Sequence, residues 1–179
     1  MKKFKIILAI TVLATVLVGC PDVTVPAFNI TDDISQEVPV AVTANADGTC
    51  KDYSETGTFD LKSNAEINEN YSKVQSVTVN SITWEVTNYA GDDDVWINSG
   101  LLKIGGTSFE IGKVNLKSAD TDNEMFILTD GTKLTAVANE IIATGAITVT
   151  LETSSGGNCE NDFSYTLKIT ANVKVSVQP

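Results

Sequence analysis

The sequence predicts a mainly β protein, an antiparallel β-sandwich of about eight strands with two short helices. The strongest observation is the alternation of apolar and polar residues that runs without a break over 163–177. Such a period of two over this length is typical of a strand with one face buried and one face in water. Shorter alternating stretches separated by glycine and aspartate turns supply the other strands. A small β-barrel is the alternative that the same pattern allows.

The N-terminal part of the predicted sandwich contains two strands and a helix. Valines alternate over 37–44, and 56–61 is a second short strand candidate. Ser63 and Glu66 then have the spacing of a capping box, in which a hydroxyl and a carboxylate bind the free amides of the first helical turn. We therefore expect a helix over 64–73, with Ser63 as its cap.

The next strand contains a change of parity. Val77 and Val79 face one way, whereas Ile82 and Trp84 have the opposite parity. A shift by one residue reverses the faces of a strand, so an extra residue near 80–81 would keep both sets inward. We therefore predict a β-bulge there. Because the strand is long and contains a tryptophan, we expect it to be central in its sheet.

The middle of the chain predicts a hairpin followed by short elements. Strands over 101–104 and 107–111 flank Gly105-Gly106, which readily adopt positive φ at both central positions of a tight turn. A short strand is expected at 114–116. The apolar run 125–128 is expected to be buried.

The last third of the chain predicts a helix and two strands. Five apolar residues follow helical spacing within 132–144, and Gly145 is placed to end that helix in a left-handed conformation. Strands over 147–151 and 163–177 complete the sandwich. The helices are expected to cover its ends or open edges.

Composition excludes several classes of function. The 179 residues include 12 lysines, no arginine, no histidine and 23 acidic residues, for a formal charge of −11. We expect no nucleic-acid partner, because there is no surplus of positive charge to meet phosphates. Without histidine, neither a Ser-His nor a Cys-His catalytic pair exists. The only enzymatic alternative left is a hydrolase that uses two carboxylates.

The first residues form a targeting segment. Three lysines lie within residues 1–5, and an apolar run follows over 6–18. This run is shorter than the roughly 20 residues that a transmembrane helix needs, and its charged start is typical of a secretory signal peptide.

The end of that segment, Leu17-Val18-Gly19-Cys20, resembles the bacterial lipoprotein signal. The resemblance covers residues 1–20 only. It implies removal of residues 1–19 and lipid attachment to Cys20, with the protein anchored in the cell envelope. We expect the outer membrane or the cell surface rather than the inner membrane. Residues 20–34 are then expected to form a lipidated tether and edge segment, and 35–179 a single β-sandwich domain.

Two cysteines remain once Cys20 is assigned to lipid. Cys50 and Cys159 form an even pair in an oxidising compartment, which favours a disulfide. Each follows a glycine by two positions and precedes an acid-aromatic-serine run, so both are expected in turns just before a strand.

Two acidic loops are candidate binding sites. Asp92, Asp93 and Asp94 lie close to Trp96, so their carboxylates are candidate calcium ligands and the indole a candidate platform for a sugar ring. The alternative is a solvated turn with Trp96 packed inward.

The second loop contains Asp120, Asp122 and Glu124, which occupy the first three ligand positions of an EF-hand-like pattern. The pattern then fails, because Met125 stands where glycine is needed and Gly131 where a bidentate glutamate is needed.

These observations predict a membrane-anchored envelope lipoprotein that acts as a non-catalytic binding or scaffold module. Its partner would be another envelope protein or a surface polysaccharide. The alternatives are a carbohydrate- or calcium-binding module that uses loops 92–96 and 120–124, and the carboxylate hydrolase. No cofactor other than calcium is suggested.

Overall fold

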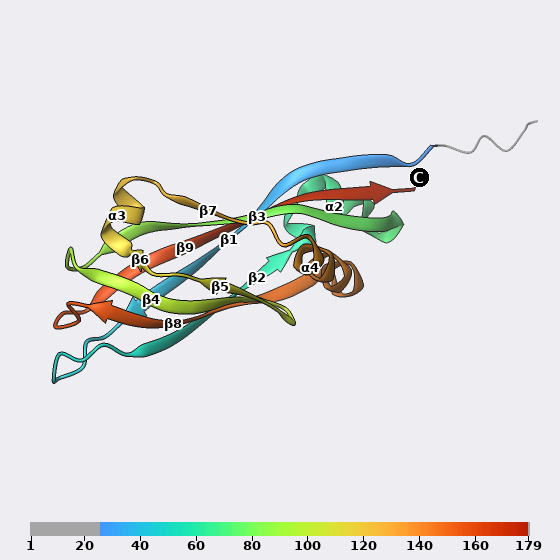
Figure 1. The fold of residues 1–179 in the computed structure, drawn as a ribbon. Coiled ribbons are helices and arrows are strands. Elements are labelled where there is room, and N and C mark those ends of the chain that lie inside the picture. The colour runs from blue at the N-terminus through green and yellow to red at the C-terminus, as the bar shows by residue number, and fades with distance from the viewer. Residues whose placement is uncertain (1–25, 179) are drawn as a thin grey trace, which may run out of the picture.

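Strands of the computed structural model form two antiparallel sheets that pack face to face (Figure 1), and residues 26–178 are described. Sheet A contains, in spatial order, β1 (Phe28–Val42), β9 (Phe163–Val177), β3 (Val74–Ala90) and β7 (Met125–Leu128). Sheet B contains β2 (Asp52–Asp60), β8 (Ala146–Gly157), β4 (Val95–Ile104) and β5 (Thr107–Ile111), and the short strand β6 (Val114–Asn115) also pairs with β4.

The order of the strands defines a jelly roll. Strands β1 to β4 alternate between the two sheets, and so do β7, β8 and β9. The four strands of sheet A and the four main strands of sheet B, connected in this way, form the double Greek key of jelly rolls. The predicted β-sandwich is therefore confirmed. The barrel alternative is wrong, because the strands form two separate sheets, each with two edge strands.

The long axis of the molecule is set by β1 and β9. They pair without interruption from Phe28 opposite Val177 to Val42 opposite Phe163. Fifteen residues in a strand span about 50 Å. We call the end where β1 starts and β9 stops the terminal end. The opposite end, with loops 43–51, 91–94 and 158–162, is the loop end.

Strand β1 begins earlier than the predicted domain boundary. Residues 28–34, which were predicted as part of the tether and edge segment, belong to this strand, and the strand is an edge of sheet A. Pro39 is tolerated in β1 because an edge strand leaves one side of its backbone unpaired.

The core lies between the two sheets and follows the alternation of β9. Every second residue of β9 is buried from Phe163 to Val177, and β8 contributes Ile147, Val149 and Leu151 in the same way. Burial of this apolar surface, worth about 25 cal/mol per Å², is the main term that holds the sheets together.

The predicted bulge in β3 is confirmed. Its register with β9 shifts between Val79 and Ser81, so Asn80 is the extra residue, and Val79 and Ile82 are both buried. The same strand is internal to sheet A, as its tryptophan suggested, and the Trp84 ring stacks on that of Phe126 at a centroid distance of 4.0 Å.

The first helix is shorter than predicted and is capped by a different residue. α2 (Ala65–Asn70) lies between two 3-10 turns, η1 (Leu61–Ser63) and η2 (Tyr71–Lys73). The side chain of Asn64 accepts a hydrogen bond from the Ile67 amide at 2.9 Å, whereas the Ser63 hydroxyl donates to the Asp60 carbonyl. The predicted Ser63 cap is therefore wrong, because Ser63 already belongs to the preceding turn.

The second predicted helix is confirmed as α4 (Gly131–Thr144). It buries Leu134, Val137 and Ile141, and it ends at Gly145, whose φ of +78° is the left-handed conformation expected there. Helices α2 and α4 lie at the terminal end (Figure 1). Among residues 26–178, none of the helices has both the length and the apolar character needed to cross a bilayer.

A third helix was not predicted. α3 (Leu116–Thr121) follows β6 directly and lies at the loop end, so the expected strand over 114–116 is limited to two residues. The helix begins at Leu116, which is buried, and its first turn is capped by the Asn115 side chain.

The apolar run 125–128 forms strand β7, and the expectation that it is buried is wrong for half of its residues. It is an edge of sheet A, and the side chains of Met125 and Ile127 are 57% and 60% exposed. Only Phe126 and Leu128 turn toward the core. A continuous apolar run does not indicate which side of a strand is covered.

Strand β4 is longer than the predicted first strand of the hairpin. It begins at Val95, and Val95 and Ile97 are buried. The hairpin itself is confirmed, although only Gly105 adopts positive φ (+57°), so the expectation for Gly106 is wrong.

Replacing the cap of α4 should destabilise the protein modestly. The Asp130 carboxylate accepts hydrogen bonds from the Thr132 and Lys133 amides. We expect Asp130→Ala to lower the free energy of unfolding by about 1 kcal/mol in urea titrations. Asp122→Ala is the control, because that carboxylate lies at the C-terminal end of α3, where negative charge is not favoured. An equal loss in both variants would contradict the assignment of the cap.

Candidate functional site

The loop end is closed by a disulfide between Cys50 and Cys159, as predicted. Their Cα atoms are 5.2 Å apart, and the bond joins the segment before β2 to the segment before β9. It therefore connects sheet B to sheet A at the loop end, where loops are the other connections between the two sheets. Cys20, the predicted lipidation site, lies outside the described residues.

The three carboxylates of loop 91–94 do not converge. Asp92 accepts a hydrogen bond from the Asn161 side chain, Asp93 pairs with Lys117 at 3.2 Å, and Asp94 accepts from the indole of Trp96 at 2.5 Å. Each carboxylate thus stabilises a different neighbour. Three oxygens that point apart do not form the cage that calcium requires.

Trp96 is half-buried and faces outward from sheet B. Its neighbours Val95 and Ile97 are buried, so the alternative in which Trp96 packs inward is wrong. The Lys113 ammonium lies 4.4 Å from the ring centroid. One face of the indole is therefore occupied by a cation, a contact worth about 0.5–1 kcal/mol at an exposed site.

Asp120, Asp122 and Glu124 are separated by the end of α3. Asp120 lies within the helix and accepts a hydrogen bond from the Tyr89 amide, and Asp122 follows at the C-cap. Within residues 26–178, no group of three or more His, Cys, Asp or Glu side chains is arranged to hold a metal ion.

Tyr89 is a residue of the loop end that the sequence did not single out. Its hydroxyl donates a hydrogen bond to the Asp92 carbonyl at 2.6 Å, which holds loop 91–94 against the end of β3. Burial, with the negative charges of Asp92 and Asp93, raises the pKa of Tyr89 to about 12. Burial also raises the pKa of Tyr53 and of Tyr165, whose hydroxyls are hydrogen-bonded to each other at 2.9 Å.

These tyrosines predict a loss of stability in alkali. A phenol with a raised pKa in the folded state contributes stability that is complete below pH 10, the value in the unfolded chain, and is lost as pH rises toward 12. We expect the folded protein at about pH 11 to show less phenolate absorbance than the same chain in urea. Identical titration curves for the two states would contradict the assignment.

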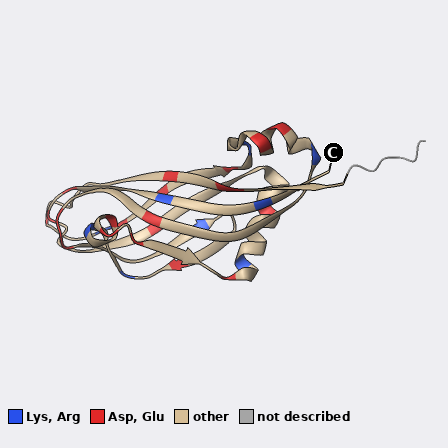
Figure 2. Cartoon of the chain, turned by 90° about the horizontal axis from the view of Figure 1, so that it is seen from above, with Lys and Arg blue, Asp and Glu red and all other residues tan. Residues whose placement is uncertain are grey.

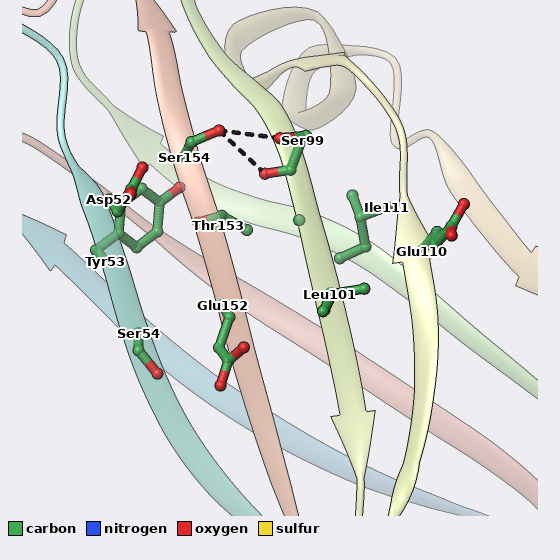
Figure 3. A pocket seen from close by; sticks show the side chains of 11 residues that line it. Asp52, Tyr53, Ser54, Ser99, Leu101, Glu110, Ile111, Glu152, Thr153 and Ser154 are labelled. Atoms are coloured by element: carbon green, nitrogen blue, oxygen red, sulfur yellow. Dashed lines mark hydrogen bonds between the residues drawn. The ribbon is translucent and has the colours of Figure 1, made fainter.

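A trough with a volume of about 780 Å³ runs across the outer face of sheet B (Figure 3). Its lining residues come from all four main strands of the sheet and are opposite one another on neighbouring strands. Ser99 is opposite Ser154 and Ser154 is opposite Asp52, while Leu101 is opposite both Glu152 and Glu110. The outward side chains are those of Asp52, Ser54, Ser99, Leu101, Glu110, Glu152 and Ser154.

The floor of the trough is built from small residues. The hydroxyls of Ser99 and Ser154 lie 3.1 Å apart in a hydrogen bond, at the point where the register of β4 shifts after Ile97. Gly100 faces the core, and a Cβ there would meet the Thr153 side chain at 2.5 Å. Both residues belong to sheet B, so β4 and β8 lie in close contact beneath the trough.

The trough is acidic and rich in hydrogen-bonding groups. Glu152 is paired with Lys103 at 2.6 Å, whereas no ion pair of the described part of the chain involves Asp52 or Glu110. Figure 2 shows acidic segments along the strands as well as in the loops of the loop end. Three serines and three carboxylates can donate to and accept from a neutral, hydroxyl-rich ligand. The negative charge disfavours an anionic ligand.

Sequence reasoning missed the trough for an identifiable reason. Ser99 and Ser154 are 55 positions apart, and nothing in the sequence indicates that they are opposite each other. The alternation of polar and apolar residues in β8, which leads up to Ser154, is common on any solvated sheet, and no such alternation surrounds Ser99.

Comparison with known proteins supports the fold and gives no family. No model of a known protein family matches the chain, and no curated protein is similar to it in sequence. Among solved structures it is similar to a decameric BFDV capsid protein, with a TM-score of 0.53 and 12% identity over 83% of this chain and 99% of that chain.

Two further similarities are weaker. A 60-mer of BFDV capsid protein has a TM-score of 0.37 and 9% identity, covering 87% of this chain and 95% of that one. A structure of Desmodium yellow mottle tymovirus has a TM-score of 0.40 and 13% identity, with coverages of 89% and 93%. These three structures are of viral proteins, and at these identities the likeness concerns the fold alone.

Proposed function

We propose that this chain is a lipid-anchored, non-catalytic binding protein of the bacterial cell envelope, and that the trough of sheet B binds a neutral surface polysaccharide. The observation that carries the proposal is the trough itself, a four-strand surface of hydroxyls and carboxylates at the loop-end half of the molecule. Polysaccharides offer many hydroxyls to such a surface.

The position of the trough suits an anchored protein. Cys20 precedes Phe28 by only eight positions, so a lipid on Cys20 would hold the terminal end within about 25–30 Å of the membrane. Asp52, the first residue of β2, marks the loop end of the trough. The trough would therefore lie in the half of the domain that is farther from the membrane.

A binding role fits the trough better than hydrolysis does. A carboxyl that acts as a general acid needs apolar surroundings to stay protonated. Asp52 and Glu110 are exposed, and Glu152 is neutralised by Lys103. These surroundings favour hydrogen bonding to a ligand over acid catalysis.

The anchor is tested by expressing the full chain in bacteria as wild type and as Cys20→Ser. We expect the wild type to partition into detergent and to carry the mass of a lipidated Cys20, and the variant to lose both properties. A wild-type chain without lipid on Cys20 would overturn the anchor.

The ligand is tested with residues 20–179 carrying Cys20→Ser, applied to immobilised bacterial surface polysaccharides. We expect retention on neutral polysaccharides and weaker retention on those that contain uronic acids. Ser99→Arg, which fills the floor of the trough, should weaken binding at least about tenfold, or 1.4 kcal/mol. Ser118→Arg on exposed α3 is the matched control and should bind as the parent does.

Two results would contradict the polysaccharide as ligand. One is a lack of retention on every polysaccharide tested, and the other is equal binding by the two arginine variants. Chemical cross-linking of the anchored protein in intact cells would then identify another envelope protein as the partner, if one dominant adduct is found.

A further inference from the structure

The four edges of the two sheets are protected unequally. An exposed edge strand offers free backbone groups to other chains, and proteins usually block it with charges, proline or a covering element. In sheet A the edge strand β1 carries Asp33, Glu37 and Pro39. In sheet B the edge strand β2 carries Asp52 and Glu55.

The other edge of sheet B is covered by α4. The Lys133 ammonium donates to the Ser108 carbonyl of β5 at 2.8 Å, and the Glu140 carboxylate accepts from the Gly106 amide at 2.9 Å. The backbone at this edge is therefore already bonded to helix side chains.

Strand β7 has none of these protections. Met125, Phe126, Ile127 and Leu128 include no charge and no proline, and β3 is the only strand that pairs with β7 in residues 26–178. Three large apolar side chains are exposed to solvent in residues 26–178, and two of them, Met125 and Ile127, belong to β7. An exposed apolar edge of this kind marks an interaction site.

The sequence of β7 is complementary to itself. Residues directly opposite each other in an antiparallel pair point to the same face. With Phe126 opposite Phe126 of a second copy, Met125 lies opposite Ile127 of that copy, and Ile127 opposite its Met125. The two exposed apolar side chains of each copy would thus lie beside and contact those of the other, in the symmetric way that a two-fold dimer requires.

We propose that β7 is a docking edge for a second copy of this chain, and that two sheets A join through antiparallel β7 strands. The inference goes beyond the proposed function and does not depend on the trough, which lies on the other sheet. A strand of four residues buries less than the roughly 1,000 Å² of a stable interface, so the dimer is weak in dilute solution. Attachment of both copies to one membrane would raise their effective concentration.

Charge opposes the dimer in a measurable way. Glu124 and Asp130 flank β7, and each copy has a large excess of acidic residues. Salt screens this repulsion. We therefore expect association to strengthen as sodium chloride is raised, the reverse of an interface held by ion pairs.

The first test is sedimentation of residues 20–179 carrying Cys20→Ser, from low micromolar to near-millimolar concentration in low and high salt. The dimer should form at the upper concentrations, and Ile127→Lys should raise its dissociation constant at least about tenfold. Asn29→Lys is the control, because it places the same charge on the exposed opposite edge of sheet A. A monomer at every concentration and salt, or equal effects of both lysines, would overturn the proposal.

The second test reads the register and does not depend on affinity. Met125→Cys and Ile127→Cys chains, mixed under mild oxidation, should form a disulfide-linked dimer of one chain of each kind. Met125→Cys alone should not, because two copies of residue 125 would be about 7–8 Å apart, beyond the reach of a disulfide. Cross-linking that is indifferent to the position of the cysteine would also overturn the proposed pairing.

Discussion

Reduction of the disulfide between Cys50 and Cys159 is expected to lower the free energy of unfolding by about 4–5 kcal/mol. The two cysteines are 109 positions apart, so the bond closes a loop that contains most of the domain. In the chain-entropy model, a loop of this length restricts the unfolded chain strongly, which gives a large stabilisation. A loss of this size is a large part of the stability of an ordinary domain.

Urea titration with and without reductant measures the effect, and the double variant Cys50→Ala, Cys159→Ala reproduces it without reductant. Hydrogen exchange of the reduced protein should increase first in loops 43–51 and 158–162, because the bond connects these segments. A change below about 1 kcal/mol would show that the loop end is held by its other contacts.

Gly157→Ala is expected to destabilise the protein by about 3 kcal/mol or more, although the residue lies at the end of β8. Its φ is +85°, a conformation that costs an L-residue about 1–2 kcal/mol. An added Cβ would also overlap the Asp94 carbonyl oxygen and lie 2.6 Å from Trp96 Cδ1. Since a backbone atom cannot move as a side-chain end does, loop 91–94 must shift.

The matched control is Gly112→Ala. No atom lies within 4 Å of a Cβ at Gly112, and its φ is not positive, so this variant should be neutral or slightly more stable. Thermal unfolding compares the two variants, and Trp96 fluorescence reports the displacement of the loop. Equal melting temperatures would contradict the close approach of Gly157 to Asp94.

The parts of the fold that could be predicted are those where apolar periodicity is long or changes sharply. Each of three patterns indicates one local structure. The alternation of β9 indicates a strand, the change of parity at Asn80 a bulge, and the spacing of α4 a helix. The pairing of the two cysteines was predictable because only two remained after Cys20 was set apart.

The missed elements are short or depend on neighbours distant in sequence. α3 has six residues, too few for helical spacing to be recognised. The start of β4 was missed because Val95 directly follows three aspartates, which indicate a loop. The exposure of Met125 and Ile127 follows from the place of β7 at the edge of sheet A, which no local pattern encodes.

The candidate site shows the same limit. The adjacency of Asp92, Asp93 and Asp94 in sequence suggested a shared ligand, but successive side chains on a turn point in different directions and find different partners. The trough instead collects residues from four strands. Its position depends on the strand order of the jelly roll, which the sequence alone did not predict.

The pairing of β1 with β9 also determines how the domain bears mechanical load. A pull between Phe28 and the loop end runs parallel to the strands, so the hydrogen bonds of the β1–β9 ladder, which lie across the pull, resist it together in shear. A pull between Phe28 and Val177, which are opposite each other, would open the same ladder one pair at a time. The domain is therefore built to hold tension along its length and to yield readily when its two chain ends are drawn apart.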